Sequence, residues 1–97
     1  MRVIARPILI KFGKRLKDAE ESIRAWYQET RRADWDNSNE LRRQYGTASV
    51  LGNGRVVFNI GGNKYRLVVA INFRAKIVYI RFIGTHQEYD LIDAETI

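Results

Sequence analysis

The chain has 97 residues, no cysteine and a formal net charge of +6, and 45% of its residues are hydrophobic. This length suits one small domain, and the composition is that of a folded protein rather than a disordered one. No apolar run reaches the roughly 20 residues that a membrane span needs, and residues 1–5 are too short and too mixed for a secretory signal. The lack of cysteine excludes disulfides and thiolate metal ligands. We therefore expect one cytoplasmic domain over residues 1–97, with no membrane partner.

The positive charge is unevenly distributed along the chain. Residues 55–84 contain six Lys and Arg residues and no acid, whereas four acids gather in residues 85–97. A small basic domain usually meets a polyanion, an acidic membrane or an acidic partner. Charge alone is equally consistent with the solvated edges of a sheet.

The start of the chain predicts a short strand and a first helix. Residues 1–5 show a β-type pattern, and Pro7 suits the first turn of a helix. Apolar side chains recur there at helical spacing, and basic side chains fill the other side. The apolar positions are Ile8, Phe12 and Leu16, and the basic ones are Lys11, Lys14, Arg15 and Lys17.

Two capping signals predict two further helices. Asp18, with Glu21 three residues later, resembles a capping box that begins a second helix with Arg31-Arg32 at its end. The apolar stripe of this helix consists of Ala19, Ile23, Trp26 and Tyr27. Asn37 and Glu40 predict the cap of a short third helix that stops at Gly46. Trp35, in the link before it, is expected in the core.

From Val50 onward the pattern indicates strands. Three β-rich runs cover residues 55–60, 63–73 and 77–83. Gly61-Gly62 predicts a two-residue hairpin turn because both central positions need positive φ, and Arg74-Ala75 predicts a second turn. The order of elements predicts an α+β domain with an antiparallel sheet.

The predicted register determines which side chains share a face, because side chains alternate along a strand. A two-residue turn at Arg74-Ala75 pairs Val68 with Arg81 and directs Phe82 toward the helices. A one-residue slip would bury Arg81 and expose Phe82, which burial energetics oppose. The opposite, open face then gathers Lys64, Arg66, Tyr79 and Arg81. Such a basic, aromatic-bearing face suits RNA, although a face kept polar for solubility is the alternative.

His86 is the only histidine, and it follows the strand that carries Arg81. A lone histidine is more often structural than catalytic, but Tyr89 and Asp90 lie within five residues of it. These groups, beside cations, supply proton transfer and phosphate stabilisation for RNA cleavage without a metal. One His, no Cys and no acidic cluster on the basic sheet argue against a metal site. Gly61–Lys64 lacks the spacing and the helix of a P-loop.

Several motifs resemble the HigB toxin family of the RelE/ParE superfamily. They are Asn53-Gly54-Arg55-Val56-Val57-Phe58-Asn59-Ile60, Gly62-Asn63-Lys64-Tyr65-Arg66-Leu67-Val68, Tyr79-Ile80-Arg81-Phe82-Ile83-Gly84-Thr85-His86 and Glu88-Tyr89-Asp90, with Arg24-Ala25-Trp26-Tyr27 and Ala33-Asp34-Trp35 in the helical half. The resemblance covers nearly the whole chain and is most specific over residues 50–93. It is looser over residues 6–17, which lack the proline expected between the first two helices.

The resemblance implies a RelE-like fold, in which an N-terminal strand and helices pack on one face of a curved antiparallel sheet. It implies a metal-independent endoribonuclease without a cofactor, an mRNA interferase that cleaves translated mRNA on the ribosome. It also implies a HigA-like helix-turn-helix antitoxin, and binding to operator DNA only through the antitoxin complex.

As a hypothesis for the mechanism, His86 is the candidate general base or acid, because an imidazole exchanges protons near neutral pH. Arg66 and Arg81 are candidates for holding the phosphate, Lys64 for donating to the leaving oxygen, and Tyr89 for orienting the nucleotide. The candidate RNA-binding residues are Arg55, Asn63, Tyr79, Lys11, Lys14 and Arg15, with Lys17, Arg31 and Arg32 as further positions facing ribosomal RNA.

Two other functions remain open. A ParE-like toxin of the same fold would act by binding DNA gyrase and would need no proton-transfer residues. A non-catalytic RNA-binding module would bind RNA with an affinity that falls steeply with salt, and would break no strand.

Overall fold

Five strands form one curved sheet in the spatial order β1-β5-β4-β3-β2. A computed structural model describes residues 1–97. Its strands are β1 (Arg2–Ile4), β2 (Ser49–Val50), β3 (Arg55–Ile60), β4 (Tyr65–Asn72) and β5 (Ile77–Thr85). Neighbouring strands are antiparallel except β1 and β5, which are parallel. The predicted α+β class is confirmed, and the sheet is mixed rather than wholly antiparallel because the first strand joins its edge beside the last.

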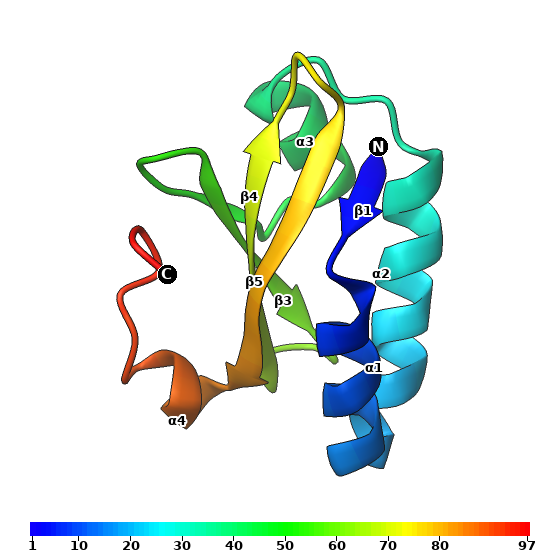
Figure 1. Cartoon of the computed structure of the whole chain (residues 1–97), viewed down its shortest axis with the longest axis vertical. Coiled ribbons are helices and arrows are strands. Elements are labelled where there is room, and N and C mark those ends of the chain that lie inside the picture. The colour runs from blue at the N-terminus through cyan, green and yellow to red at the C-terminus, as the bar shows by residue number, and fades with distance from the viewer.

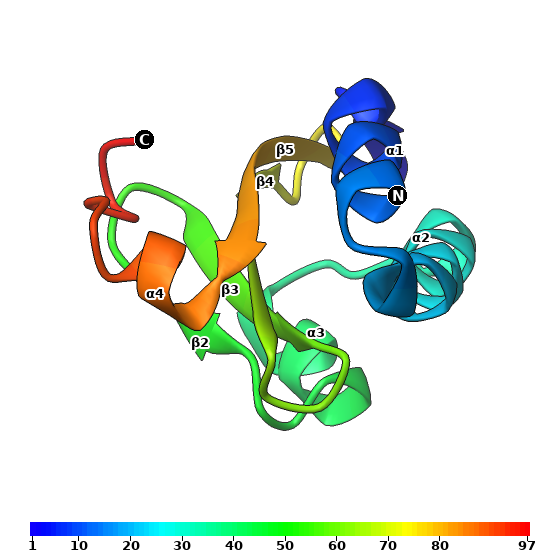
Figure 2. The same ribbon diagram turned by 90° about the horizontal axis from the view of Figure 1, so that it is seen from below.

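The helices are α1 (Arg6–Arg15), α2 (Glu20–Arg32), α3 (Ser38–Gln44) and α4 (His86–Tyr89). α1 and α2 lie side by side as a helical hairpin on one side of the sheet, whereas α4 and the C-terminus lie on the other (Figures 1 and 2). No helix combines the length and the apolar character that crossing a membrane requires.

The main core lies between the helical hairpin and the sheet, and the predicted stripe of α2 contributes Ile23 and Trp26 to it. The indole of Trp26 meets the ring of Phe58 edge-on at 5.3 Å between centroids. The prediction for α1 is wrong in part, because Ile8 is 39% exposed and its neighbour Leu9 is buried. The buried face of α1 includes Gly13, where a Cβ would lie 3.4 Å from the side chain of Glu20 on α2. Close contact with α2 thus sets the rotation of α1.

One predicted helix cap is confirmed and the other is wrong. The Asn37 side chain accepts the Glu40 amide hydrogen at 3.0 Å and begins α3. α2 instead begins after a single 3-10 turn, Lys17–Ala19, with no side-chain cap. The carboxylate of Asp18 accepts a hydrogen bond from the Tyr65 hydroxyl at 2.6 Å. Asp18 therefore binds a residue distant in the chain instead of forming the predicted capping box with Glu21.

The two predicted turns differ in outcome. Gly61 and Gly62 both have positive φ, 63° and 71°, as predicted. Ile60 nevertheless pairs with Tyr65, so the turn has four residues and Lys64 lies outside β4. At the second turn, Asn72 pairs with Ile77 in the predicted register, and the Lys76 amide donates to the Phe73 carbonyl at 3.3 Å.

The predicted register fails farther along β5 because of a β-bulge. Val69 pairs with Ile80, but Val68 pairs with Phe82, so Arg81 is an extra residue between the two pairs. The bulge reverses the alternation of side chains beyond it. Ile83 therefore enters the main core, whereas Phe82 packs on the opposite face. Counting alternate positions assumes an unbroken ladder, which this strand does not have.

Candidate functional site

The face of the sheet opposite the helices carries the predicted arginines and Tyr79. Pairing across the sheet places Arg55, Ala70 and Tyr79 in one row and Asn59 beside Arg66 in another row of the same face. Tyr79 is 37% exposed. β3, β4, β5 up to Gly84, and their turns contain no acidic side chain. The face therefore has a positive potential that suits an anionic polymer.

α4 follows β5 directly and positions His86 and Tyr89. The hydroxyl of Thr85 accepts the Glu88 amide hydrogen at 3.2 Å, and the Glu88 carboxylate accepts the Thr85 amide hydrogen at 2.9 Å, which completes a capping box. His86 is the first residue of this four-residue helix and Tyr89 is its last. Arg66 pairs with Gly84, only two residues before His86, so this arginine lies at the end of the sheet where α4 begins.

The two aromatic side chains of α4 have different surroundings. The imidazole of His86 is exposed, with Nε2 3.8 Å from the Asp90 carboxylate. The ring of Tyr89 is half-buried against a small apolar cluster built on Val57 and Val68. His86 is thus free to meet a substrate, and Tyr89 is held against the sheet.

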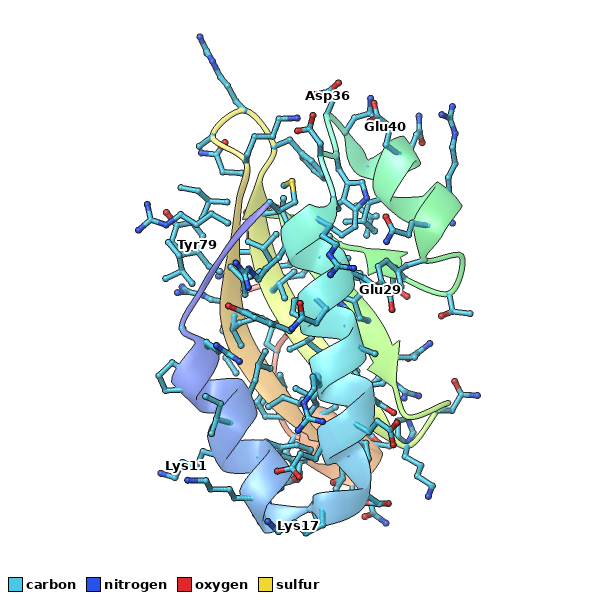
Figure 3. The ribbon with its side chains drawn as sticks, turned by 90° about the vertical axis from the view of Figure 1, so that its right-hand side faces the viewer. Lys11, Lys17, Glu29, Asp36, Glu40 and Tyr79 are labelled. Atoms are coloured by element: carbon cyan, nitrogen blue, oxygen red, sulfur yellow. The ribbon has the colours of Figure 1, made fainter.

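Arg15 joins the helical hairpin to α4. Its guanidinium donates to the Glu88 carboxylate at 2.7 Å. This hydrogen bond, followed by that from the Thr85 amide, lowers the pKa of Glu88 below its ordinary value of 4.5. Lys11 and Lys14, also predicted to bind RNA, are exposed and form no ion pair. Lys11 and Lys17 point away from the molecule near the lower end of the hairpin (Figure 3).

Lys64 and Asn63 lie in the turn before β4. The ammonium of Lys64 is 3.4 Å from the Asp18 carboxylate, which belongs to the helical side of the sheet. Asp18 has a lowered pKa, mainly through the Tyr65 hydroxyl and then through Lys64. The structure therefore directs Lys64 away from the face that carries Arg55, Arg66 and Arg81. Asn63 contributes its carbonyl, which accepts a hydrogen bond from Arg66 at 2.9 Å.

Residues 91–97, here called the C-terminal strap, cover part of the face that was predicted to be open. The Ile97 carbonyl oxygen accepts hydrogen bonds from Arg55, through Nε at 3.1 Å and Nη2 at 2.6 Å. Arg81 donates to the same oxygen through Nε at 3.3 Å. Ala94, 7% exposed, packs on Val57 and Val68. The apolar positions of the strap alone did not predict this contact, because they are few and not periodic.

The arrangement can hold an extended phosphodiester. Guanidinium groups of Arg66 and Arg81 provide several N–H donors for phosphate oxygens, and His86 supplies a group for proton transfer. None of the four surface cavities is lined by Arg66, Arg81 or His86, and the most enclosed is a groove of about 180 Å³ between α1 and α2, lined by Leu9, Ile10 and neighbouring residues. A charged face without a pocket at these residues suits a polymer better than a small molecule.

Comparisons with known proteins show what the sequence is similar to. Residues 19–92 match the family model of the HigB toxin, described as the RelE-like toxic component of a toxin–antitoxin system. The chain is 47% identical over 38 residues to the mRNA interferase toxin HigB of Escherichia coli K12, and equally to the mRNA interferases HigB of E. coli O157:H7 and Shigella flexneri. This stretch is 39% of the chain and spans 36% of the length of each relative.

Proposed function

Because the chain belongs to the HigB toxin family of RelE-like toxic components, we propose that it is an endoribonuclease that cleaves mRNA on the translating ribosome. One observation carries the proposal: His86 and Tyr89 of α4 lie at the end of a sheet face that presents Arg66 and Arg81 and whose strands contain no acid. The identity with mRNA interferases over 38 residues supports it. The same family membership supports an antitoxin partner.

The proposed chemical step uses reacting groups of the RNA and side chains of this chain. The 2′-hydroxyl attacks the adjacent phosphorus in line and yields a cyclic phosphate, and the 5′-oxygen of the next nucleotide leaves. His86 removes the proton of the 2′-hydroxyl, and the two arginines stabilise the charge that grows on the phosphate oxygens. Lys64 remains the proposed donor to the leaving oxygen, and for this it has to release Asp18, 3.4 Å away.

The partners follow from the proposed activity. A HigA-like antitoxin with a helix-turn-helix domain would neutralise the toxin, and the complex would bind operator DNA. On the ribosome, exposed basic side chains would contact ribosomal RNA, and their attraction supplies affinity without sequence preference. These side chains are Lys11, Lys14, Lys17, Arg31 and Arg32, all exposed on the helical hairpin and the link within it. The proposed site of action is the cytoplasm.

The decisive experiment maps mRNA 5′ ends in a translating extract that receives the purified protein, with naked RNA in parallel. New ends at codon-phased positions only in the translating sample support the proposal. Cuts in naked RNA would indicate a ribonuclease that does not need the ribosome. No cuts in either sample, with folded protein, would contradict the proposal and favour a gyrase-binding toxin, which a DNA supercoiling assay detects.

His86 is tested in the same extract. We expect His86→Ala to lower the cleavage rate by about 10²-fold or more, because general acid–base catalysis contributes that much. The control is Gln87→Ala, which changes the next exposed residue of α4. Full cleavage by His86→Ala would exclude the proposed role of the imidazole.

A further inference from the structure

The C-terminal strap lies on the sheet face without joining the sheet. Its amide hydrogens form no bond with a strand: those of Thr96 and Ile97 are donated to the Asp93 carbonyl within the strap itself. Beyond the arginine contacts, the Asn53 side chain donates to the Glu95 carbonyl at 3.2 Å. A segment held by side chains and a small apolar contact, with no ladder, can detach without breaking the sheet.

The Ile97 oxygen of the strap occupies a position at which the surrounding N–H donors would bind an anion strongly. Three N–H groups of Arg55 and Arg81 converge on the Ile97 carbonyl oxygen. Guanidinium donors form strong, charge-assisted hydrogen bonds with ionised phosphate oxygens, so the same three N–H groups suit an RNA phosphate. Asp93 and Glu95 flank Ala94, which packs on Val57 and Val68 of a face whose strands carry no acid. The strap therefore stands where RNA phosphate would bind and opposes that binding electrostatically.

We propose that the strap is an autoinhibitory element, which occupies the phosphate position of Arg55 and Arg81 and which RNA must displace. The inference rests on the proposed function, because it takes this face as the RNA-binding face. It adds that the free protein is closed and that binding includes an opening step. The apparent affinity for RNA is then the intrinsic affinity of the open protein multiplied by the fraction of molecules in which the strap is open.

A reversible staple tests the opening step. A Cβ built on Gly52 lies 3.5 Å from Cδ of Glu95, so these two positions are neighbours. Gly52→Cys/Glu95→Cys puts two thiols there in a chain that has no other cysteine, and mass spectrometry of the oxidised protein determines whether they form a disulfide. The probe is a fluorescent, uncleavable 2′-O-methyl RNA heptamer, and its binding is followed by anisotropy before and after reduction. We expect the oxidised protein to bind about tenfold more weakly than the reduced protein, and reduction to restore binding.

A control and an opposite variant complete the test. With Arg55→Ala/Arg81→Ala added, oxidation should no longer change the affinity, because the covered site is gone. Ile92→Ala/Ile97→Ala should loosen the strap and tighten RNA binding several-fold, with Leu91→Ala, at an 87% exposed position, as the matched control. If mass spectrometry shows no disulfide, the RNA affinity of Ile92→Ala/Ile97→Ala alone tests the inference.

Three outcomes would overturn the inference. Equal affinity of the oxidised and reduced proteins would show that the strap need not move. Unchanged affinity of the loosened variant would show that the strap does not compete with RNA. Failure of the wild type and every variant to bind the heptamer would show that Arg55 and Arg81 hold no RNA phosphate. The cleavage assay in translating extract is read separately, so the proposed function can hold while this inference fails.

Discussion

Arg15 and Glu88, 73 positions apart in the chain, form a hydrogen-bonded ion pair at 2.7 Å between Nη2 and Oε1. The same carboxylate closes the capping box with Thr85. One side chain thus attaches the start of α4 both to the end of β5 and to the helical hairpin. Because α4 carries His86, this contact also sets where the proposed proton-transfer group lies.

The ion pair predicts a pH dependence of stability. Glu88 has a lowered pKa in the folded protein. At pH values between the folded and the unfolded pKa of this carboxyl, the unfolded chain therefore binds more protons than the folded protein. The contribution of Glu88 is complete above the unfolded value near 4.5 and is lost as the pH falls through the lower, folded value. The carboxyls of Asp18 and Asp34, whose pKa values are also lowered, act in the same direction.

We therefore expect Glu88→Gln to weaken the fall of the free energy of unfolding between about pH 5 and pH 3. Urea unfolding at a series of pH values measures this fall. Glu21→Gln, at an exposed position of α2 without an ion pair, is the control that should keep the wild-type slope. An unchanged slope in Glu88→Gln would mean that the pair contributes nothing in solution.

Gly84 is expected to tolerate no side chain. A Cβ at this position would lie 2.5 Å from Cζ of Phe82 and 3.1 Å from Cβ of Glu88. Gly84→Ala should therefore displace Phe82 or α4 and destabilise the fold by about 1–3 kcal/mol, the usual cost of overpacking. At Gly46 a Cβ would meet nothing within 4 Å, so Gly46→Ala should unfold at a urea concentration close to that of the wild type. Equal stability of the two variants would contradict the packing described here.

Arg66 and Arg74 form a matched pair for testing the charge of the site. Both are arginines of the acid-free region, but Arg66 lies on the sheet face and Arg74 in the exposed β4–β5 turn. Arg66→Ala should lower the cleavage rate in translating extract by about 10²–10³-fold, the usual effect of removing a donor to transition-state charge. Arg74→Ala should cleave at nearly the wild-type rate. Similar losses in both would show that only the overall charge matters.

The salt dependence of ribosome binding tests the basic side chains of α1. Replacing Lys11 and Lys14 by Ala removes two exposed charges. If each lysine contacts one phosphate of single-stranded RNA, the slope of the logarithm of the ribosome-binding constant against the logarithm of the salt concentration should fall in magnitude by about 1.4. Sedimentation with ribosomes at several salt concentrations measures it. Lys11→Arg/Lys14→Arg keeps the charge and should keep the slope. A slope unchanged in the Ala variant would remove α1 from the interface.

Much of the fold follows from signals within a few residues. The cap of α3 at Asn37 needs only Glu40, three positions away, and the positive φ of Gly61 and Gly62 is a property of glycine itself. The apolar alternation of β4, from Tyr65 to Ile71, is confirmed as the core face. Local hydrogen bonds and burial patterns act over one or two turns of chain, so these elements and the core face of β4 could be predicted from the amino-acid sequence.

Only the tertiary structure decided how the site is assembled. Arg81 lies at a bulge because Ile83 reaches the main core while Phe82 packs on the other face. Asp18 meets Tyr65 instead of capping α2, and the strap carries the Ile97 carbonyl to Arg55. Each of these contacts joins segments far apart in the chain, and each depends on which surface remains uncovered once the sheet has formed. No local pattern in the sequence shows which distant segment will cover which surface.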